Sequence, residues 1–357
     1  MTEHEVIIVG GGPAGAGCAK VLVDEGIDVL VIEKNELPRY KTCSGVLFGQ
    51  TQFLLEKYFG AMPSKDIYCK PEIINAENVR EWSREEGYKR FIWEIDKDGQ
   101  SFSNDYHNVW RNKFDFWLLQ QSGTDYLEKC ALENFELENG HVKIKTRQSS
   151  NSTGGDNGEM KCRYLVGADG GTSRVRKILD PTWGSQDAGA AAVHIYQGYY
   201  QIEDKGSLND KGWTVFFEPE IGEMLTCVHR KDDQLVLCVG GFTGRNLIES
   251  IETLVAFLAE NFQVKLGKQE RHEGCYLSLP TPCLGEGRVI LAGEAAGQMY
   301  LNGEGISAAI DGGYRAGKAI VRGIRDNVDV INEYQETSAD IQGHVRTCLE
   351  QIHFLSV

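Results

Sequence analysis

The chain has 357 residues, of which 41% are hydrophobic and 25% charged, and its formal net charge is −15. This length allows two domains, and the composition is that of a globular protein with a sizeable core. The acidic excess argues against broad nucleic-acid binding, which needs a basic face, and disfavours docking on anionic lipid without a local basic patch. The chain starts with polar residues, its ten cysteines lack CxxC spacing, and no apolar run is long enough to span a membrane. We therefore expect a cytoplasmic protein with free thiols and no metal site.

The first predicted elements are a strand, a helix and a second strand. A β-branched run at residues 6–9 predicts a buried strand, and apolar positions at helical spacing in 13–25 predict a helix that ends at Gly26. Residues 29–32 form the next apolar run. This order predicts a βαβ unit with a right-handed crossover.

The rest of the chain is predicted to consist mainly of strands, interrupted by helices. Residues 66–105 carry alternating stretches such as 91–95, and the Ser/Asn/Gly-rich stretch 149–158 predicts a hairpin tip. Strands are predicted at 141–146, 161–166, 193–201, 213–217, 224–229, 235–240 and 288–292. Helices are predicted at 110–121, 249–262 and 305–325. The order favours a nucleotide-binding domain that is interrupted by a β-rich domain and then completed.

The turn after the first strand carries a dinucleotide-binding motif, G-x-G-x-x-G. Its residues are Gly10, Gly12, Pro13, Ala14 and Gly15. The string alone is weak, but it follows a strand, opens a helix, and Glu33 ends the next strand. Gly12 would let the backbone approach a pyrophosphate at the helix N-terminus, and Glu33 would accept hydrogen bonds from ribose hydroxyls. The motif predicts a bound dinucleotide but does not choose between FAD and NAD.

Two later Gly-rich turns also follow buried strands, and they favour FAD. They contain Asp169, Gly293, Glu294, Gly303, Gly305 and Ile306. Glu294 can hydrogen-bond a polyol chain such as the ribityl group. The amides at 303–306 begin a helix and can face the electron-rich edge of an isoalloxazine, where the helix dipole would stabilise an anionic reduced flavin.

Together these segments resemble the geranylgeranyl reductase family of flavoproteins, within the para-hydroxybenzoate-hydroxylase-like superfamily. The matching motifs are G-x-G-x-x-G, Pro-Arg-Tyr-Lys-Thr-Cys-Ser-Gly at 38–45, Arg-x-x-Phe-Asp-x-x-Leu at 111–118, Gly-Ala-Asp-Gly at 167–170, Gly-Glu-Ala-Ala-Gly at 293–297 and Gly-Glu-Gly-Ile at 303–306. The resemblance covers roughly residues 5–325 and implies an α/β protein whose Rossmann-like FAD-binding domain is interrupted by a β-rich substrate domain. The expected FAD-binding domain is 1–65, 106–182 and 284–330, the substrate domain 66–105 and 183–283, and a C-terminal helical segment 331–357.

The resemblance also implies roles for single residues. Arg111 would contact the FAD phosphate or ribityl region, Cys43 would lie near the ring, and Asp169 would lie in the turn under the cofactor. Glu294 stands where the family usually has Asp, an extra methylene that the site can tolerate. Besides the residues of the three turns, the set expected to bind FAD comprises Glu33, Lys34, Arg39, Cys43, Ser44, Gly45 and Arg111.

Several motifs distinguish the branches of this superfamily. Gly297 stands where aromatic hydroxylases usually carry His, and no Pro lies between Gly297 and Gly303, which agrees with the reductase branch. The halogenase motif Trp-x-Trp-x-Ile-Pro does not occur in the sequence. The reductases' substrate-tunnel motif, Tyr-x-Trp-x-Phe-Pro, is replaced by Leu-Thr-Cys-Val-His-Arg at 225–230. A long polyprenyl substrate is therefore not implied, and the pocket is either smaller or more polar.

The candidate catalytic residues are Cys43, Cys227 and His229. Cys227 and His229 alternate by two and would share one face of a strand, either as proton donors beside the flavin or as packing groups. Cys43 is either a redox-active or proton-donating thiol or a small residue that fits against the ring. Our hypothesis is hydride transfer from N5 of reduced FAD to an activated or isoprenoid C=C bond, with a proton from Cys43, His229 or water.

Two other functions stay open. One is a flavin monooxygenase of hydroxylase or halogenase type that acts on a small aromatic or a quinone, and the other is a non-catalytic FAD-binding electron carrier. The sequence has no second dinucleotide motif, so the electron donor is either NAD(P)H bound transiently or a ferredoxin- or flavodoxin-like protein. The expected substrate is a small apolar molecule. Leu349, Ile352, Phe354 and Leu355 either pack a terminal helix on the core or form an apolar patch for transient membrane contact.

Overall fold

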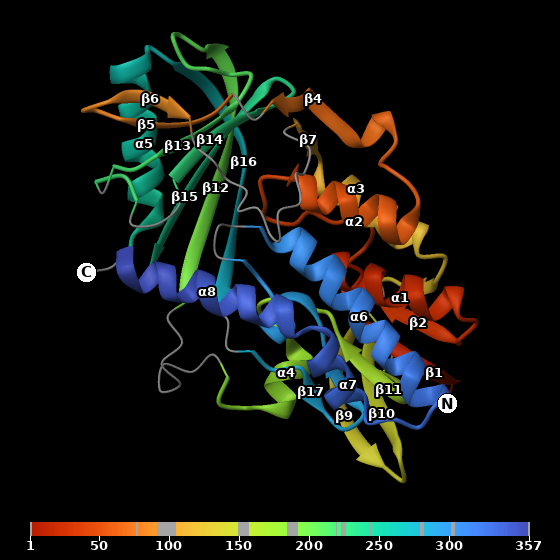
Figure 1. Ribbon diagram of the computed structural model, residues 1–357. Helices are drawn as coiled ribbons and strands as arrows, with labels where there is room; N and C mark the ends of the chain where they lie inside the picture. The colour runs from red at the N-terminus through yellow and green to blue at the C-terminus, as the bar shows by residue number, and fades with distance from the viewer. Residues whose placement is uncertain are drawn as a thin grey trace.

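Figure 1 shows the computed structural model of the chain, in which two large sheets lie at different ends of the molecule. The structure describes residues 2–75, 78–90, 105–148, 157–183, 192–218, 220–222, 226–242, 244–278, 282–300 and 304–355. The predicted alternating run 91–95, most of the predicted hairpin tip 149–158 and Gly303 lie outside the described residues. The same holds for the side chains of Leu349, Ile352, Phe354 and Leu355.

The first sheet has eight strands and is built around β1 (Thr2–Val9). Its main order is β17-β18-β11-β1-β2-β8, and β10 and β9 extend it from β11. β2 (Val29–Ile32) and β11 (Asn157–Gly167) both pair with β1 in parallel, so the predicted βαβ unit is confirmed. Because the carboxyl ends of parallel strands meet at one edge, the turns after β1, β2, β11 and β18 gather there. The remaining strands are β8 (Asp125–Leu127), β9 (Cys130–Glu138), β10 (His141–Gln148), β17 (Gly285–Glu286) and β18 (Val289–Leu291).

Two helices that cover this sheet, α1 (Pro13–Asp24) and α6 (Gly305–Arg325), are in direct backbone contact. A Cβ at Gly313 would lie 2.0 Å from the carbonyl oxygen of Ala14, and one at Gly17 would lie 2.6 Å from that of Ile310. Only glycine fits at these two positions. The crossing fixes α6 relative to the turn that opens α1.

The second sheet has seven strands in the order β16-β12-β15-β14-β13-β5-β6. One face packs on α5 (Leu247–Phe262), where the rings of Phe216, Phe257 and Phe262 meet edge to face or tilted. Side chains alternate along a strand, so Val215 points to the opposite face. The strands are β5 (Val79–Ser83), β6 (Gly87–Arg90), β12 (Ala192–Asp204), β13 (Trp213–Phe216), β14 (Thr226–Lys231), β15 (Gln234–Phe242) and β16 (Lys265–Ser278).

The face of the second sheet that carries Val215 packs on a small third sheet, which has three strands in the order β3-β7-β4. The segment 66–105, predicted as part of the β-rich domain, therefore divides between two sheets. β4 and the start of β7 belong to the small sheet, whereas β5 and β6 form the edge of the seven-stranded sheet. The other elements of this region are β3 (Val46–Leu47), α2 (Gly49–Phe59), η1 (Lys65–Ile67), β4 (Tyr68–Asn75), β7 (Asp105–Val109) and α3 (Arg111–Gln121).

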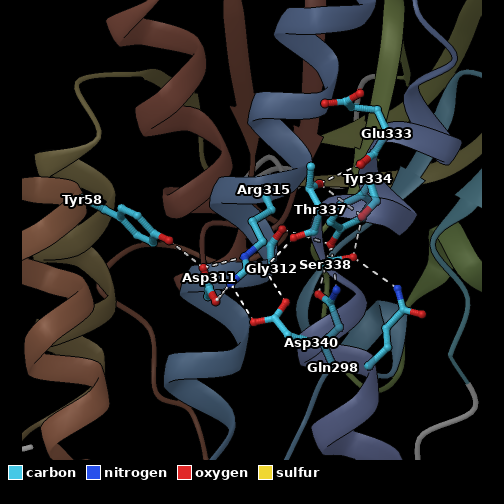
Figure 2. Close-up of polar contacts among 11 residues, drawn as sticks. Tyr58, Gln298, Asp311, Gly312, Arg315, Glu333, Tyr334, Thr337, Ser338 and Asp340 are labelled. Atoms are coloured by element: carbon cyan, nitrogen blue, oxygen red, sulfur yellow. Dashed lines mark hydrogen bonds and ion pairs between the residues drawn. The ribbon is translucent and has the colours of Figure 1, made fainter. Parts of the chain in front are cut away.

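The last two helices, α7 (Val330–Thr337) and α8 (Ala339–Leu355), are attached to α6 by the polar network in Figure 2. Arg315 on α6 donates to Asp311 at 2.7 and 2.9 Å and also pairs with Asp340 on α8. Beyond this network α8 runs toward the seven-stranded sheet (Figure 1). Among the described residues, no helix combines the length and the apolar character needed to cross a membrane.

A second chain of hydrogen bonds connects α7 to the turn after β18 (Figure 2). The hydroxyl of Tyr334 donates to the carbonyl oxygen of Gly312 (3.0 Å) and accepts from Nε2 of Gln298 (2.9 Å). Oε1 of Gln298 in turn accepts a hydrogen bond from the backbone amide of Gly293 (2.9 Å). The C-terminal helices thus hold the turn at the carboxyl edge of the first sheet.

Candidate functional site

A cavity of about 560 Å³ lies between two surfaces. One is the carboxyl edge of the eight-stranded sheet, and the other is the face of the seven-stranded sheet that carries Val215. This volume is typical of a small-molecule or cofactor site. The predicted site residues that line it are Gly10, Gly12, Pro13, Ala14, Glu33, Lys34, Arg39, Cys43, Ser44, Arg111, Asp169, Cys227, Glu294, Gly305 and Ile306. The predicted residues that the structure describes but places outside the lining are Gly15, Gly45, His229 and Gly293.

The turn after β1 has the geometry that its glycines predict. Gly10 has a φ of 109°, and a Cβ there would lie 2.4 Å from the carbonyl oxygen of Ala168. A Cβ at Gly15 would lie 2.0 Å from the carbonyl oxygen of Gly10, so the helix approaches the strand only without that side chain. Within the described chain, no side chain caps α1 at Gly12. The N-terminus of α1 is therefore available to a phosphate.

Beside this turn lies a buried network of two carboxylates and two guanidiniums. Oε2 of Glu33 accepts hydrogen bonds from the Gly11 amide (3.2 Å) and from Nε of Arg39 (3.0 Å). Arg39 also donates to Asp115 (3.1 Å), which receives two hydrogen bonds from Arg111 (2.8 and 3.0 Å). Burial raises the pKa of Asp115, but the charges of Arg111 and Arg39 outweigh this effect, so the pKa lies below its ordinary value. Asp115 fixes both arginines, a role that the motif at 111–118 did not predict.

Glu294 presents a carboxylate oxygen for a ligand. Its Oε1 atom is buried and, in the part of the chain that the structure describes, has no hydrogen-bond partner. The other oxygen, Oε2, lies 3.8 Å from Nζ of Lys41. A Cβ at Gly171 would lie 2.3 Å from Oε1, so the glycine leaves room for this carboxylate. Because a buried carboxylate oxygen without a donor costs free energy, a ligand hydroxyl at this point would stabilise the site.

The turns that follow β11 and β18 each precede the start of a helix. Asp169 accepts hydrogen bonds from Oγ of Ser173 (2.5 Å) and from the Arg174 amide (2.6 Å), at the start of α4 (Arg174–Leu179). Its carboxylate therefore stabilises the turn that lines the cavity. The 3-10 turn η4 (Gly293–Ala296) follows β18, and α6 begins at Gly305 on the cavity wall. The positive end of the α6 dipole is thus directed at the cavity.

Cys43 lies in the cavity wall contributed by the loop that precedes β3. Its amide donates to Oε1 of Gln197 on β12 (3.2 Å), and the Gly45 amide donates to its sulfur (3.4 Å). Gly45 has a φ of 66°. Burial raises the pKa of the Cys43 thiol, but the Arg111 guanidinium, the Gly45 amide and the charge of Lys41 together outweigh that effect, and the pKa lies below its ordinary value. Cys43 is thus a thiol whose anion is stabilised at the cavity surface.

His229 occupies a different position from its strand neighbour Cys227. Cys227 lines the cavity, whereas His229 is 1% exposed and lies beneath the Cys43 loop, with Nε2 3.2 Å from the carbonyl oxygen of Ser44. Burial and the nearby charge of Lys231 lower the pKa of His229 to about 3. The ring is therefore neutral, and its N–H donates to Ser44. This geometry supports the packing interpretation of His229 and gives no support to its interpretation as a catalytic proton donor.

The sequence patterns did not identify a further group of cavity residues, which lie on the seven-stranded sheet. They are Ile195, Gln197, Cys238, Cys275 and Tyr276. The strand patterns around 193–201 and 235–240 could have placed some of them on a common face, but the pattern of a single strand does not show which residues meet across strands. Among the described residues, no group of three or more His, Cys, Asp or Glu side chains is arranged to hold a metal ion.

Comparison with known proteins decides the family. Residues 3–63 and 71–234 match the family model for an FAD binding domain. The chain belongs to this family. FAD is accordingly its cofactor, and the cavity fits that assignment because it joins an uncapped helix N-terminus, a glycine turn and the unpartnered oxygen of Glu294.

The chain is also similar to several individual proteins, which have different names. An uncharacterised protein of Methanosarcina barkeri is 26% identical over 92% of this chain and 77% of its own length. The structure of a geranylgeranyl bacteriochlorophyll reductase-like protein from Thermoplasma acidophilum has a TM-score of 0.80, with 17% identity over 98% of this chain and 87% of its own. The myxobacterial halogenase CndH has a TM-score of 0.72, with 16% identity over 96% of this chain and 79% of its own. At these identities the two structures show a shared fold.

Proposed function

We propose that this FAD-dependent oxidoreductase reduces an activated or isoprenoid C=C bond of a compact apolar substrate by hydride transfer from reduced flavin. The observation that carries the proposal is the extent of the cavity, which begins at the nucleotide turns and ends at a sheet wall that contains Ile195 and Trp213. Hydride transfer needs such a space beside the ring, where a substrate is held against the flavin and water is excluded.

In this proposal the cofactor lies along the cavity. The N-terminus of α1 at Gly12 would hold the pyrophosphate, Glu33 the ribose hydroxyls and Glu294 the ribityl hydroxyls. The ring would then lie between the start of α6 at Gly305 and the seven-stranded sheet. FAD supplies the two-electron chemistry when bound. The dipole of α6 would stabilise negative charge on the adjacent edge of the ring.

Cys43 is the group that we propose as the proton donor. It lies in the wall of the cavity, and Arg111 would stabilise the thiolate that remains after the proton has left. Arg111 is itself held in place by Asp115. His229 has no part in this scheme, because it is neutral and lies beneath the loop.

The substrate end of the cavity is bounded by rigid aromatic packing. Trp213 stacks on Phe48 with ring centroids 5.8 Å apart, and Phe48 meets Tyr106 edge to face at 4.9 Å. All three side chains are buried. Such a wall favours a compact substrate over a long polyprenyl chain, in agreement with the altered tunnel motif.

The test uses the holoprotein without oxygen. The flavin is reduced by light, and its reoxidation is followed by absorbance after addition of either a compact enone or a short isoprenoid. The proposal expects reoxidation by the enone, or by a short isoprenoid, and a product heavier by two hydrogen atoms. It is overturned if only oxygen reoxidises the flavin and a phenol accelerates oxygen uptake, which is the result that the monooxygenase alternative requires.

Two cysteine variants separate the role of the cavity thiol from general effects of losing a thiol. Cys43→Ser should keep the flavin spectrum but reoxidise more slowly with the alkene, by about 10²-fold, because general acid catalysis contributes roughly that much. Cys162→Ser, in the buried strand β11 away from the cavity, should react like the unchanged protein. Equal rates for Cys43→Ser and the unchanged protein would remove Cys43 from the scheme.

A further inference from the structure

Two cysteines on neighbouring strands face each other in the wall of the cavity. Cys227 on β14 and Cys238 on β15 are direct cross-strand partners, and both line the cavity. Directly opposed residues of antiparallel strands have Cα atoms about 4.5–5.5 Å apart, which lies within the range of about 4.4–6.8 Å that a disulfide spans. The spacing of directly paired residues is therefore compatible with a disulfide between Cys227 and Cys238.

The position of this pair relative to the cofactor follows from the two ends of the cavity. The glycine turn and Glu33 mark the end where adenosine belongs, so the isoalloxazine must lie toward the seven-stranded sheet. Cys227 and Cys238 are part of that sheet wall, and Cys43 lines the same cavity. Both members of the pair are almost fully buried, at 1% and 3% exposed. A flavin in the cavity would lie against the same wall.

We propose that Cys227 and Cys238 form a redox-active dithiol–disulfide pair that exchanges two electrons with the flavin. The proposal rests on FAD binding in the cavity and does not depend on which substrate the protein reduces. In one direction the reduced flavin gives up two electrons and one proton and becomes oxidised flavin. The S–S bond breaks, and with one further proton from solvent the two sulfurs become thiols. In the other direction the two thiols lose two electrons and two protons, the S–S bond forms, and the flavin takes up both electrons and one proton.

The consequence is that the holoprotein holds twice the reducing equivalents of its flavin. Anaerobic titration of ferricyanide-oxidised holoprotein with dithionite should require about four electrons per FAD, because the disulfide is a two-electron couple in addition to the flavin. Cys227→Ser and Cys238→Ser should each require about two. Cys283→Ser is the matched control, because Cys283 is a partly exposed thiol that does not line the cavity, and it should still require about four.

A second measurement identifies the bond and needs no variant. Oxidised and dithionite-reduced holoprotein are alkylated, digested and analysed by mass spectrometry. The proposal expects a peptide pair linked through Cys227 and Cys238 in the oxidised sample, and both cysteines alkylated in the reduced sample. A link from either cysteine to Cys43, or no link at all, overturns the proposal even if the serine variants fail to fold.

The remaining outcomes are equally decisive. A linked peptide together with a titration of about two electrons would mean a disulfide that the flavin does not reach, and this refutes the exchange. Because no alkene is added in either measurement, the result is independent of the C=C reduction proposed above. A protein that fails to reduce alkenes but takes up about four electrons would lose the proposed function and keep the dithiol.

Discussion

Gly313 lies where the backbones of α6 and α1 meet, so a side chain at this position should lower the stability of the protein. In Gly313→Ala the new methyl group would lie 2.0 Å from the carbonyl oxygen, 2.8 Å from the carbonyl carbon and 2.9 Å from the Cα of Ala14. None of these atoms can rotate away, because all belong to the backbone. Ordinary contact begins at 3.4 Å, so α6 must withdraw from α1 by about 1.4 Å.

The expected loss of stability is the difference between two effects. Overpacking costs about 1–3 kcal/mol, and the rigid backbone at this contact favours the upper end of that range. Alanine is better than glycine inside a helix by about 1 kcal/mol. We therefore expect Gly313→Ala to lower the free energy of unfolding by about 2 kcal/mol. The FAD content of the purified protein should also fall, since α1 and α6 both begin at the cavity.

The assay is urea unfolding of the holoprotein, followed by circular dichroism and flavin fluorescence. Gly343→Ala in α8 is the matched control, because a Cβ there meets no atom of the described chain within 4 Å. This variant should gain about 0.5–1 kcal/mol from helix propensity alone. The reasoning is refuted if Gly313→Ala is as stable as the unchanged protein, or if the control loses as much stability as the test variant.

Three further predictions concern charged or titratable groups of the site. The pKa of His229 is about 3 in the folded chain and about 6.5 in the unfolded chain, so the unfolded chain binds the proton first. As the pH falls from about 6.5 to about 3, the contribution of His229 to the free energy of unfolding should therefore decrease by up to about 1.4 kcal/mol per pH unit. Urea unfolding at several pH values should show a flatter pH dependence for His229→Gln. Asp115→Asn would leave Arg39 and Arg111 without their shared carboxylate and should lower the unfolding free energy by about 3–5 kcal/mol. Because the pKa of Asp115 is lowered, its contribution in the unchanged protein is complete above about pH 3.9 and is lost as the pH falls from there through the folded pKa, which acid titration of both proteins will measure. Glu294→Ala should weaken FAD binding to the apoprotein about 10–100-fold in a fluorescence titration, because a hydrogen bond to a charged group contributes about 1.5–3 kcal/mol; unchanged affinity would show that the carboxylate does not contact the cofactor.

Local patterns predicted much of the fold because the features that fix it are local. The turn at Gly10 needs a positive φ and a close approach of the helix to the strand. The glycines at neighbouring positions of the sequence indicate both. The helix predicted at 249–262 lies within two residues of α5, since its apolar stripe packs on one sheet face. β16 was not predicted. Its half-buried positions include Gln269, Arg271 and Glu273, so no apolar alternation marks the strand.

The parts of the site that escaped prediction depend on register or depth. Spacing places Cys227 and His229 on one strand face, but only the packing shows that one reaches the cavity and the other lies beneath Ser44. The partnership of Cys227 with Cys238 depends on how β14 and β15 align, which neither strand's own sequence records. Asp115 lies four residues after Arg111 on α3, a spacing that indicates an ion pair but not that Arg39 would join it.

The hydrogen bonds from Tyr334 through Gln298 to the Gly293 amide have a practical consequence for dividing this chain. Every cofactor motif of the sequence lies before residue 330, so a fragment that stops there would look sufficient for FAD binding. Such a fragment would lack the phenol that holds Gln298, and with it the support of the turn beside Glu294. The fraction of the protein that holds FAD would then depend on whether α7 is in place. A ligand or a mutation that displaces α7 should change the flavin spectrum without touching the cavity.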